Sequence, residues 1–177
     1  AGHSVKQAAA LVQQQAEESI ESPETHTNQT NYFLLALGEA GVVADDKKIL
    51  HLLEQAHHLF GVEATMEQII VPFLRRIGEL WCEKKWGEYQ EAVSSQTIRD
   101  FLANLRRHFY IPENAPLVVG SCLPNERHEI PMQILLVQCM LRGYRTLMLG
   151  PAPAPTAIES TVSLASPAIV LLTASTH

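Results

Sequence analysis

The sequence has few features that would cross-link the chain, anchor it in a membrane or bind it to nucleic acid. Its three cysteines, Cys82, Cys122 and Cys139, are far apart and show no Cys-x-x-Cys spacing, which indicates reduced thiols in a cytoplasmic setting. No apolar run reaches the roughly 20 residues of a membrane-spanning helix. The 13 Lys and Arg are outnumbered by 19 Asp and Glu, so these 177 residues are a poor candidate for binding nucleic acid by themselves.

Up to about residue 112 the apolar residues recur at helical spacing. Such stripes cover residues 31–40, 49–60, 66–81 and 88–109, and Gly41 is a plausible cap for the first of them. Four amphipathic helices with short connections predict an antiparallel four-helix bundle within residues 25–112. Ahead of it, Ser4 predicts the start of a short helix over residues 5–15, and the residues up to about 27 have the composition of a linker.

Beyond Pro112 the pattern changes to short apolar runs bounded by turn residues. Such runs at 117–120, 145–150 and 168–172 predict buried parallel strands, and residues 129–142 and 155–165 predict helices between them. This order predicts an open α/β sheet of Rossmann-like or flavodoxin-like type over residues 113–177. Because doubly wound sheets usually have five or six strands, we expect the sheet to be truncated in this sequence.

The loop after the first predicted strand, residues 121–131, is the first candidate site. It has no glycine-rich phosphate cradle, which disfavours dinucleotide binding. Glu126 and His128 could form a carboxylate–imidazole pair whose other ring nitrogen binds a metal. They could equally be solvated residues at the start of a helix, where the helix dipole favours a carboxylate.

A second candidate site lies in the predicted bundle. Trp81 ends one helix, and Glu91 follows near the start of the next, beside the small residues Ala92, Ser94 and Ser95. A large, flat, partly polar ligand would suit the shallow space that these small side chains leave. The alternative is that Trp81 caps the core and that Glu91 is stabilised by the helix dipole.

Both sites resemble those of one family. The loop 125–130, with its Glu126-x-His128 motif, and the segment 147–151 look like the cobalamin-binding domain of the light-dependent MerR-family regulators, the CarH/LitR group. Trp81 followed by Glu91 is similar to that family's signature in the helix bundle. Residues 1–24 resemble the end of a MerR-type DNA-binding domain and its linker.

The resemblance implies a photoreceptor module that holds adenosylcobalamin between bundle and sheet and is not an enzyme. In it, His128 would be the lower axial ligand of cobalt and Glu126 would orient the imidazole. The module would form a homo-oligomer, a dimer or tetramer, that binds DNA through a domain missing from this chain. Light-induced loss of the adenosyl group would change the oligomeric state and the DNA binding. The cofactor-binding residues implied are Trp81, Cys82, Glu91, Ser95, Glu126, Arg127, His128, Thr173 and Ser175, of which Thr173 and Ser175 would face the nucleotide tail.

The sequence departs from the family at three positions. Cys82 and Ala92 stand where members have histidines, and Pro131 stands where related cobalamin carriers have glycine. Cys82 could supply a thiolate to the upper face of cobalt or be a small buried residue. The alternatives are therefore a corrinoid carrier for methyl transfer, a relative that binds another or a second tetrapyrrole, and a structural protein that has lost the cofactor.

Overall fold

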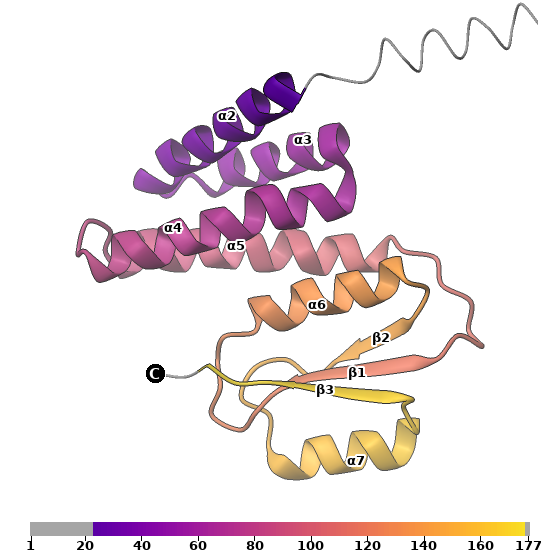
Figure 1. Ribbon diagram of the computed structural model, residues 1–177. Coiled ribbons are helices and arrows are strands. Elements are labelled where there is room, and N and C mark those ends of the chain that lie inside the picture. The colour runs from indigo at the N-terminus through magenta and orange to yellow at the C-terminus, as the bar shows by residue number, and fades with distance from the viewer. Residues whose placement is uncertain (1–22, 176–177) are drawn as a thin grey trace, which may run out of the picture.

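The computed structural model describes residues 23–175, with a helical part above a small α/β part (Figure 1). Four α-helices and one π-helical segment form the helical part: α2 (Pro23–Val42), α3 (Asp46–Ala64), η1 (Thr65–Ile70), α4 (Val71–Cys82) and α5 (Glu88–Arg107). The α/β part consists of β1 (Leu117–Cys122), α6 (Ile130–Leu141), β2 (Arg145–Met148), α7 (Pro155–Ala165) and β3 (Ile169–Thr173). A helical part followed by a parallel α/β part is the predicted order.

The apolar stripes of the helices meet in one core. Its fully buried side chains include Leu37 of α2, Ile49 of α3, Phe73 of α4 and Leu102 of α5. The predicted periodicity is confirmed because buried residues recur at steps of three and four within a helix, as Ile49, Leu52, Leu53 and Ala56 do in α3. None of the helices within residues 23–175 is long and apolar enough to cross a membrane.

Helix α2 is longer at both ends than the sequence predicted. It begins at Pro23, inside the predicted linker, because the fixed backbone of proline suits the first turn of a helix. It continues past Gly41, which therefore is not a cap. A Cβ at Gly41 would lie 2.2 Å from Cη2 of the buried Trp86, so the glycine permits a close contact between α2 and the turn after α4. The predicted helix over residues 5–15 lies outside the described residues.

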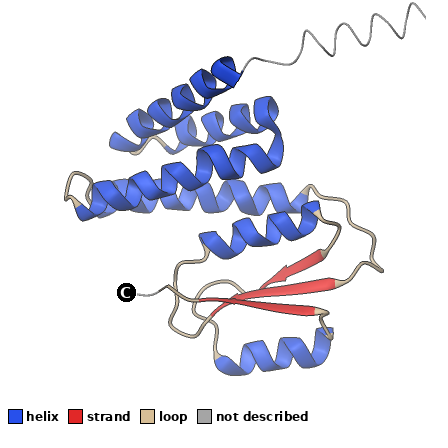
Figure 2. Ribbon diagram, in the orientation of Figure 1, coloured by secondary structure: helices blue, strands red, loops and turns tan. Residues whose placement is uncertain are grey.

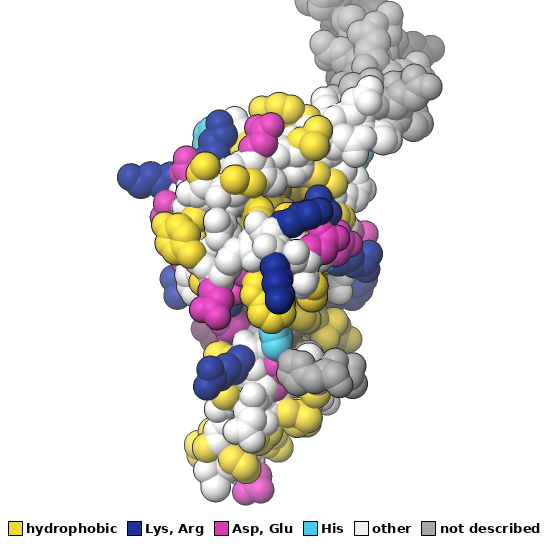
Figure 3. Space-filling view, turned by 90° about the vertical axis from the view of Figure 1, so that its left-hand side faces the viewer, with side chains coloured by type: hydrophobic (Ala, Val, Ile, Leu, Met, Phe, Trp, Pro, Cys, Tyr) yellow, Lys and Arg dark blue, Asp and Glu magenta, His cyan; other side chains and the backbone are white. Residues whose placement is uncertain are grey.

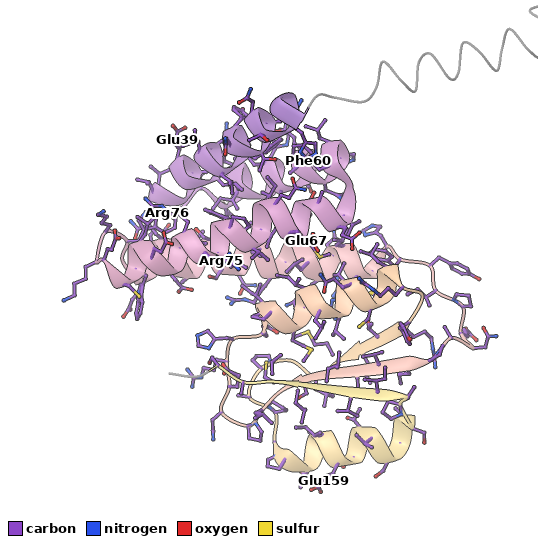
Figure 4. The ribbon with its side chains drawn as sticks, in the orientation of Figure 1. Glu39, Phe60, Glu67, Arg75, Arg76 and Glu159 are labelled. Atoms are coloured by element: carbon purple, nitrogen blue, oxygen red, sulfur yellow. The ribbon has the colours of Figure 1, made fainter. Side chains whose placement is uncertain are left out.

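The three strands form a parallel sheet in the order β2-β1-β3 (Figure 2). Val119 of the central strand is paired with Leu147 of β2 and with Val170 of β3. Strand β2 ends at Met148, two residues before the predicted end at Gly150, whose φ of 78° leaves the extended conformation. Helices α6 and α7 lie on opposite faces of the sheet, and Glu159 of α7 points away from it (Figure 4).

Helix α6 belongs to both parts of the molecule. Its residues Ile130 and Val137 are buried in the helical core, whereas Met132 and Leu136 pack against the sheet. Gly120 of β1 allows this approach, because a Cβ there would lie 2.6 Å from Sδ of Met132. The loop between β1 and α6 is therefore held at the junction of the helical and α/β parts.

Candidate functional site

A cleft of about 490 Å³ opens between the helical part and the loop before α6. This volume is in the range of small-molecule sites. Hydrophobic, acidic, basic and histidine side chains gather where the two parts meet (Figure 3). The cleft is lined by Leu74, Ile77, Gly78 and Trp81 of α4, by Glu88, Glu91, Ser95 and Arg99 of α5, and by Arg127, His128, Glu129, Ile130 and Pro131.

His128 lies in this cleft and is held by Glu126. One carboxylate oxygen of Glu126 lies 2.7 Å from Nδ1 of the imidazole and accepts the backbone N–H of His128 at 2.7 Å. The imidazole side chain is 63% exposed, whereas the carboxylate is only 9% exposed. A carboxylate at Nδ1 favours the tautomer with a proton on Nδ1, which leaves the lone pair on Nε2 for a metal.

Ser175, two residues beyond the end of β3, completes this group. Its backbone N–H and its hydroxyl both donate to the second carboxylate oxygen of Glu126, and the hydroxyl lies 3.1 Å from Nδ1 of His128. The Ser175 hydroxyl, followed by the backbone N–H groups of His128 and Ser175, holds the pKa of Glu126 far below its usual range. The carboxylate therefore stays ionised and remains an acceptor for the Nδ1 proton.

The opposite wall of the cleft carries the two residues singled out in the helices. Trp81, in the last turn of α4, is 52% exposed, and Glu91 stands in the first turn of α5. The hydroxyl of the buried Ser95 donates to Glu91 at 2.8 Å and orients this carboxylate. The structure thus brings Trp81, Glu91 and Ser95 into one cleft with Arg127 and His128.

Three candidate residues, Cys82, Thr173 and Ser175, are not among the residues that line the cleft. Cys82 is exposed. The Thr173 hydroxyl donates to Sγ of Cys122, and the Cys122 thiol donates to the backbone carbonyl of His128. Burial raises the pKa of Cys122, which keeps the thiol protonated. Thr173 and Ser175 therefore bond to the β1–α6 segment, because β3 pairs with β1 and both strands end at the same edge.

The sequence analysis missed Arg99 and Glu129, which also line this cleft. Nε of Arg99 on α5 lies 3.7 Å from a carboxylate oxygen of Glu129, the residue before α6. Arg99 follows Glu91 and Ser95 at four-residue steps, so the helical period could have placed it on the same face of α5. No local signal could have paired it with Glu129, because 30 positions separate the two residues in the chain.

The side chains of this site fit a metal ion that is already chelated by a macrocycle. Among residues 23–175 there is no group of three or more His, Cys, Asp or Glu side chains that could hold a metal ion. A single imidazole with an orienting carboxylate is the arrangement by which proteins bind an axial position of a metal already chelated by a tetrapyrrole. His128 could therefore bind the metal of such a group, with Trp81 and Glu91 on the other side of the cleft.

A comparison with protein families points to the same group. A family model described as "B12 binding domain" matches residues 36–106, from α2 to the end of α5. Among solved structures, the methanol:cobalamin methyltransferase complex MtaBC from Methanosarcina barkeri is similar over 97% of this chain and 69% of that chain, at 14% identity and a TM-score of 0.42. No curated protein matches the sequence. Residues 36–106 are therefore similar to a B12 binding domain, and this similarity indicates a cobalamin or corrinoid cofactor.

Proposed function

We propose that this chain is the adenosylcobalamin-binding, light-sensing module of a transcription regulator and has no enzymatic activity of its own. The observation that carries the proposal is the cleft in which Trp81 and Glu91 face the same space as a carboxylate-oriented imidazole. When bound, adenosylcobalamin supplies a cobalt–carbon bond that light can break. The residues of the chain bind this group, orient it and exclude water from it.

On the lower side, His128 is the proposed axial ligand. Glu126 holds its Nδ1 side at 2.7 Å, and Ser175 holds Glu126, so the ring needs little reordering when Nε2 binds. Such outer partners raise the basicity of an imidazole ligand and fix its direction. The Cys122 thiol supports the same loop through the His128 carbonyl.

On the upper side, Trp81 and Glu91 are proposed to cover the adenosyl group. The exposed indole would bury apolar area against the cofactor, at about 25 cal/mol per Å², and the Glu91 carboxylate can accept hydrogen bonds from ribose hydroxyls. A methyl carrier must open this face to partner enzymes, so a covered upper face favours a sensor. We propose that loss of the adenosyl group removes these contacts and thereby changes a homo-oligomer, since a ligand shifts an equilibrium only through contacts that differ between two states.

Reconstitution with adenosylcobalamin in the dark tests the ligand assignment. After desalting, the protein is expected to retain one equivalent of corrin with the absorption spectrum of imidazole-coordinated cobalt. His128→Ala is expected to lose that spectrum and most of the affinity. His51→Ala, which removes an exposed imidazole on α3, is the matched control. Unchanged binding and spectrum in His128→Ala would overturn the assignment.

A second experiment separates the sensor from the methyl carrier. The sensor is expected to prefer adenosylcobalamin to methylcobalamin, and illumination is expected to change both its spectrum and its molar mass in light scattering. Trp81→Ala is expected to reduce the preference, because it uncovers the upper face. Equal affinity for both cobalamins together with a light-independent mass would favour the carrier.

A further inference from the structure

The contact between α5 and α6 joins the two walls of the cleft. Ile130 and Val137 of α6 join the core that holds Leu102 of α5. Arg99 and Glu129, which both line the cleft, add an ion pair to this apolar contact. The two side chains are only 28% and 18% exposed, so solvent screens their attraction less than that of a surface pair. Figure 4 shows side chains extending between α5 and α6.

Glu129 is held from both directions. Its backbone carbonyl accepts the N–H of Gln133 at 3.0 Å and so forms part of the first turn of α6. Its carboxylate reaches across to Arg99, while its backbone continues directly from His128. The contacts of Glu129 therefore constrain the backbone of His128, to which it is joined by a peptide bond.

Arg99 is oriented on α5 before it meets Glu129. Its Nε and Nη2 atoms donate to Oε1 of Gln96 at 3.1 and 2.9 Å, which fixes the guanidinium along the helix. Glu91, Ser95 and Arg99 follow one another at four-residue steps on the cleft face of α5. The helix that presents Glu91 on one wall thus also holds the loop of the other wall.

We propose that Glu129 and Arg99 are positioning residues that set the distance of His128 from α5 and so couple the ligation state of His128 to the packing of the helical part. The inference rests on the proposed function only where cobalamin affinity is the quantity measured. A change at His128 would be transmitted through Glu129 and Arg99, the direct contact between the two walls, to the helix that carries Glu91.

Charge exchange across the pair is the decisive experiment. Arg99→Glu and Glu129→Arg are each expected to lower cobalamin affinity about tenfold or more at low salt, and the double exchange is expected to recover most of the loss, as a close ion pair predicts. If Arg99 acted only by touching the cofactor, the double variant would be as weak as Arg99→Glu. Arg99→Lys, which keeps the charge, is expected to stay close to the unchanged protein.

A readout without cofactor separates this inference from the proposed function. Nitrogen NMR of the His128 imidazole is expected to shift in Arg99→Gln, a substitution on another helix, and to return toward its original position in the double exchange. Glu79→Gln, which breaks the exposed pair between Arg76 and Glu79, is the matched control and should leave the signal in place. If Arg99→Gln leaves both the His128 signal and the cobalamin affinity unchanged, the inference is wrong even where the unchanged protein binds cobalamin.

Discussion

At the scale of the residue, the Glu126 carboxylate is the centre of the candidate site. It receives the Ser175 hydroxyl and two backbone N–H groups, and it contacts Nδ1 of His128. The backbone donors do not depend on side-chain identity, so the loop favours an ionised carboxylate at this position. The carboxylate rather than the serine is therefore expected to dominate the orientation of the imidazole.

Two substitutions test whether Glu126 contributes more than Ser175 to the orientation of the His128 imidazole. Glu126→Gln is expected to weaken cobalamin binding roughly 10- to 100-fold, the usual effect of losing the partner of a metal-bound histidine. Ser175→Ala leaves the backbone N–H in place and is expected to cost clearly less. Absorbance titration of both variants gives the comparison, and a larger loss for Ser175→Ala would contradict the arrangement.

His57 is a second residue whose environment has a measurable effect. Burial, with a smaller contribution from the neighbouring His58, lowers its pKa below the ordinary value of 6.5. The unfolded chain therefore binds more protons than the folded one below that pH, and the free energy of unfolding falls as the pH decreases through the folded pKa. Nδ1 of His57 has no hydrogen-bond partner within the described part of the chain, and the ring packs edge-on against Phe101.

His57→Gln is expected to remove this contribution. Denaturant unfolding measured between pH 7 and pH 5 should show a shallower loss of stability in the variant than in the unchanged protein, about 1.4 kcal/mol less for each unit by which the folded pKa lies below the unfolded one. Parallel pH profiles of the two proteins would show that protonation of His57 does not oppose folding.

At the scale of the element, α2 carries two glycines with opposite surroundings. A Cβ at Gly38 would meet no atom within 4 Å, whereas a Cβ at Gly41 would lie 2.2 Å from the Trp86 ring. Glycine inside a helix costs stability relative to alanine unless the missing side chain makes room for a neighbour. The same substitution should therefore have opposite signs one turn apart.

Gly38→Ala is expected to stabilise the protein by about 0.5–1 kcal/mol. Gly41→Ala is expected to destabilise it by about 1–3 kcal/mol, because the Trp86 ring must move in a packed core. Thermal and denaturant unfolding of the two variants provide the test. The fluorescence of Trp86 should change in Gly41→Ala, and equal effects of the two substitutions would rule out the close contact.

At the scale of the whole molecule, α6 makes the two parts one folding unit. Ile130 and Val137 complete the core of the helical part, while Met132 and Leu136 complete the core of the sheet. If α6 unfolded, apolar residues that are now buried in both parts would become exposed to solvent. Unfolding of the helices and of the sheet is therefore expected to be a single transition.

Leu136→Ala tests this coupling from the side of the sheet. The side chain is fully buried, so the substitution is expected to cost about 2–5 kcal/mol. Because the helical part shares α6, the far-UV circular dichroism and the tryptophan fluorescence, whose residues all lie in the helical part, should shift together. A helical transition that stays in place while the sheet melts earlier would contradict a single unit.

The sequence alone determined what depends on neighbours along the chain. Helical stripes such as Ile69, Phe73 and Ile77 and the three apolar strands follow from periods and spacings of a few residues. The spacing of Glu126 and His128 allowed a pair but left it open, and the structure places the two side chains 2.7 Å apart. The tertiary structure decided what depends on residues distant in sequence. The contact of Trp86 with Gly41, the bond from Ser175 to Glu126 and the ion pair of Arg99 with Glu129 join segments 30 or more positions apart. No local pattern records such pairs, because they form only when packing of the apolar faces has brought the segments together.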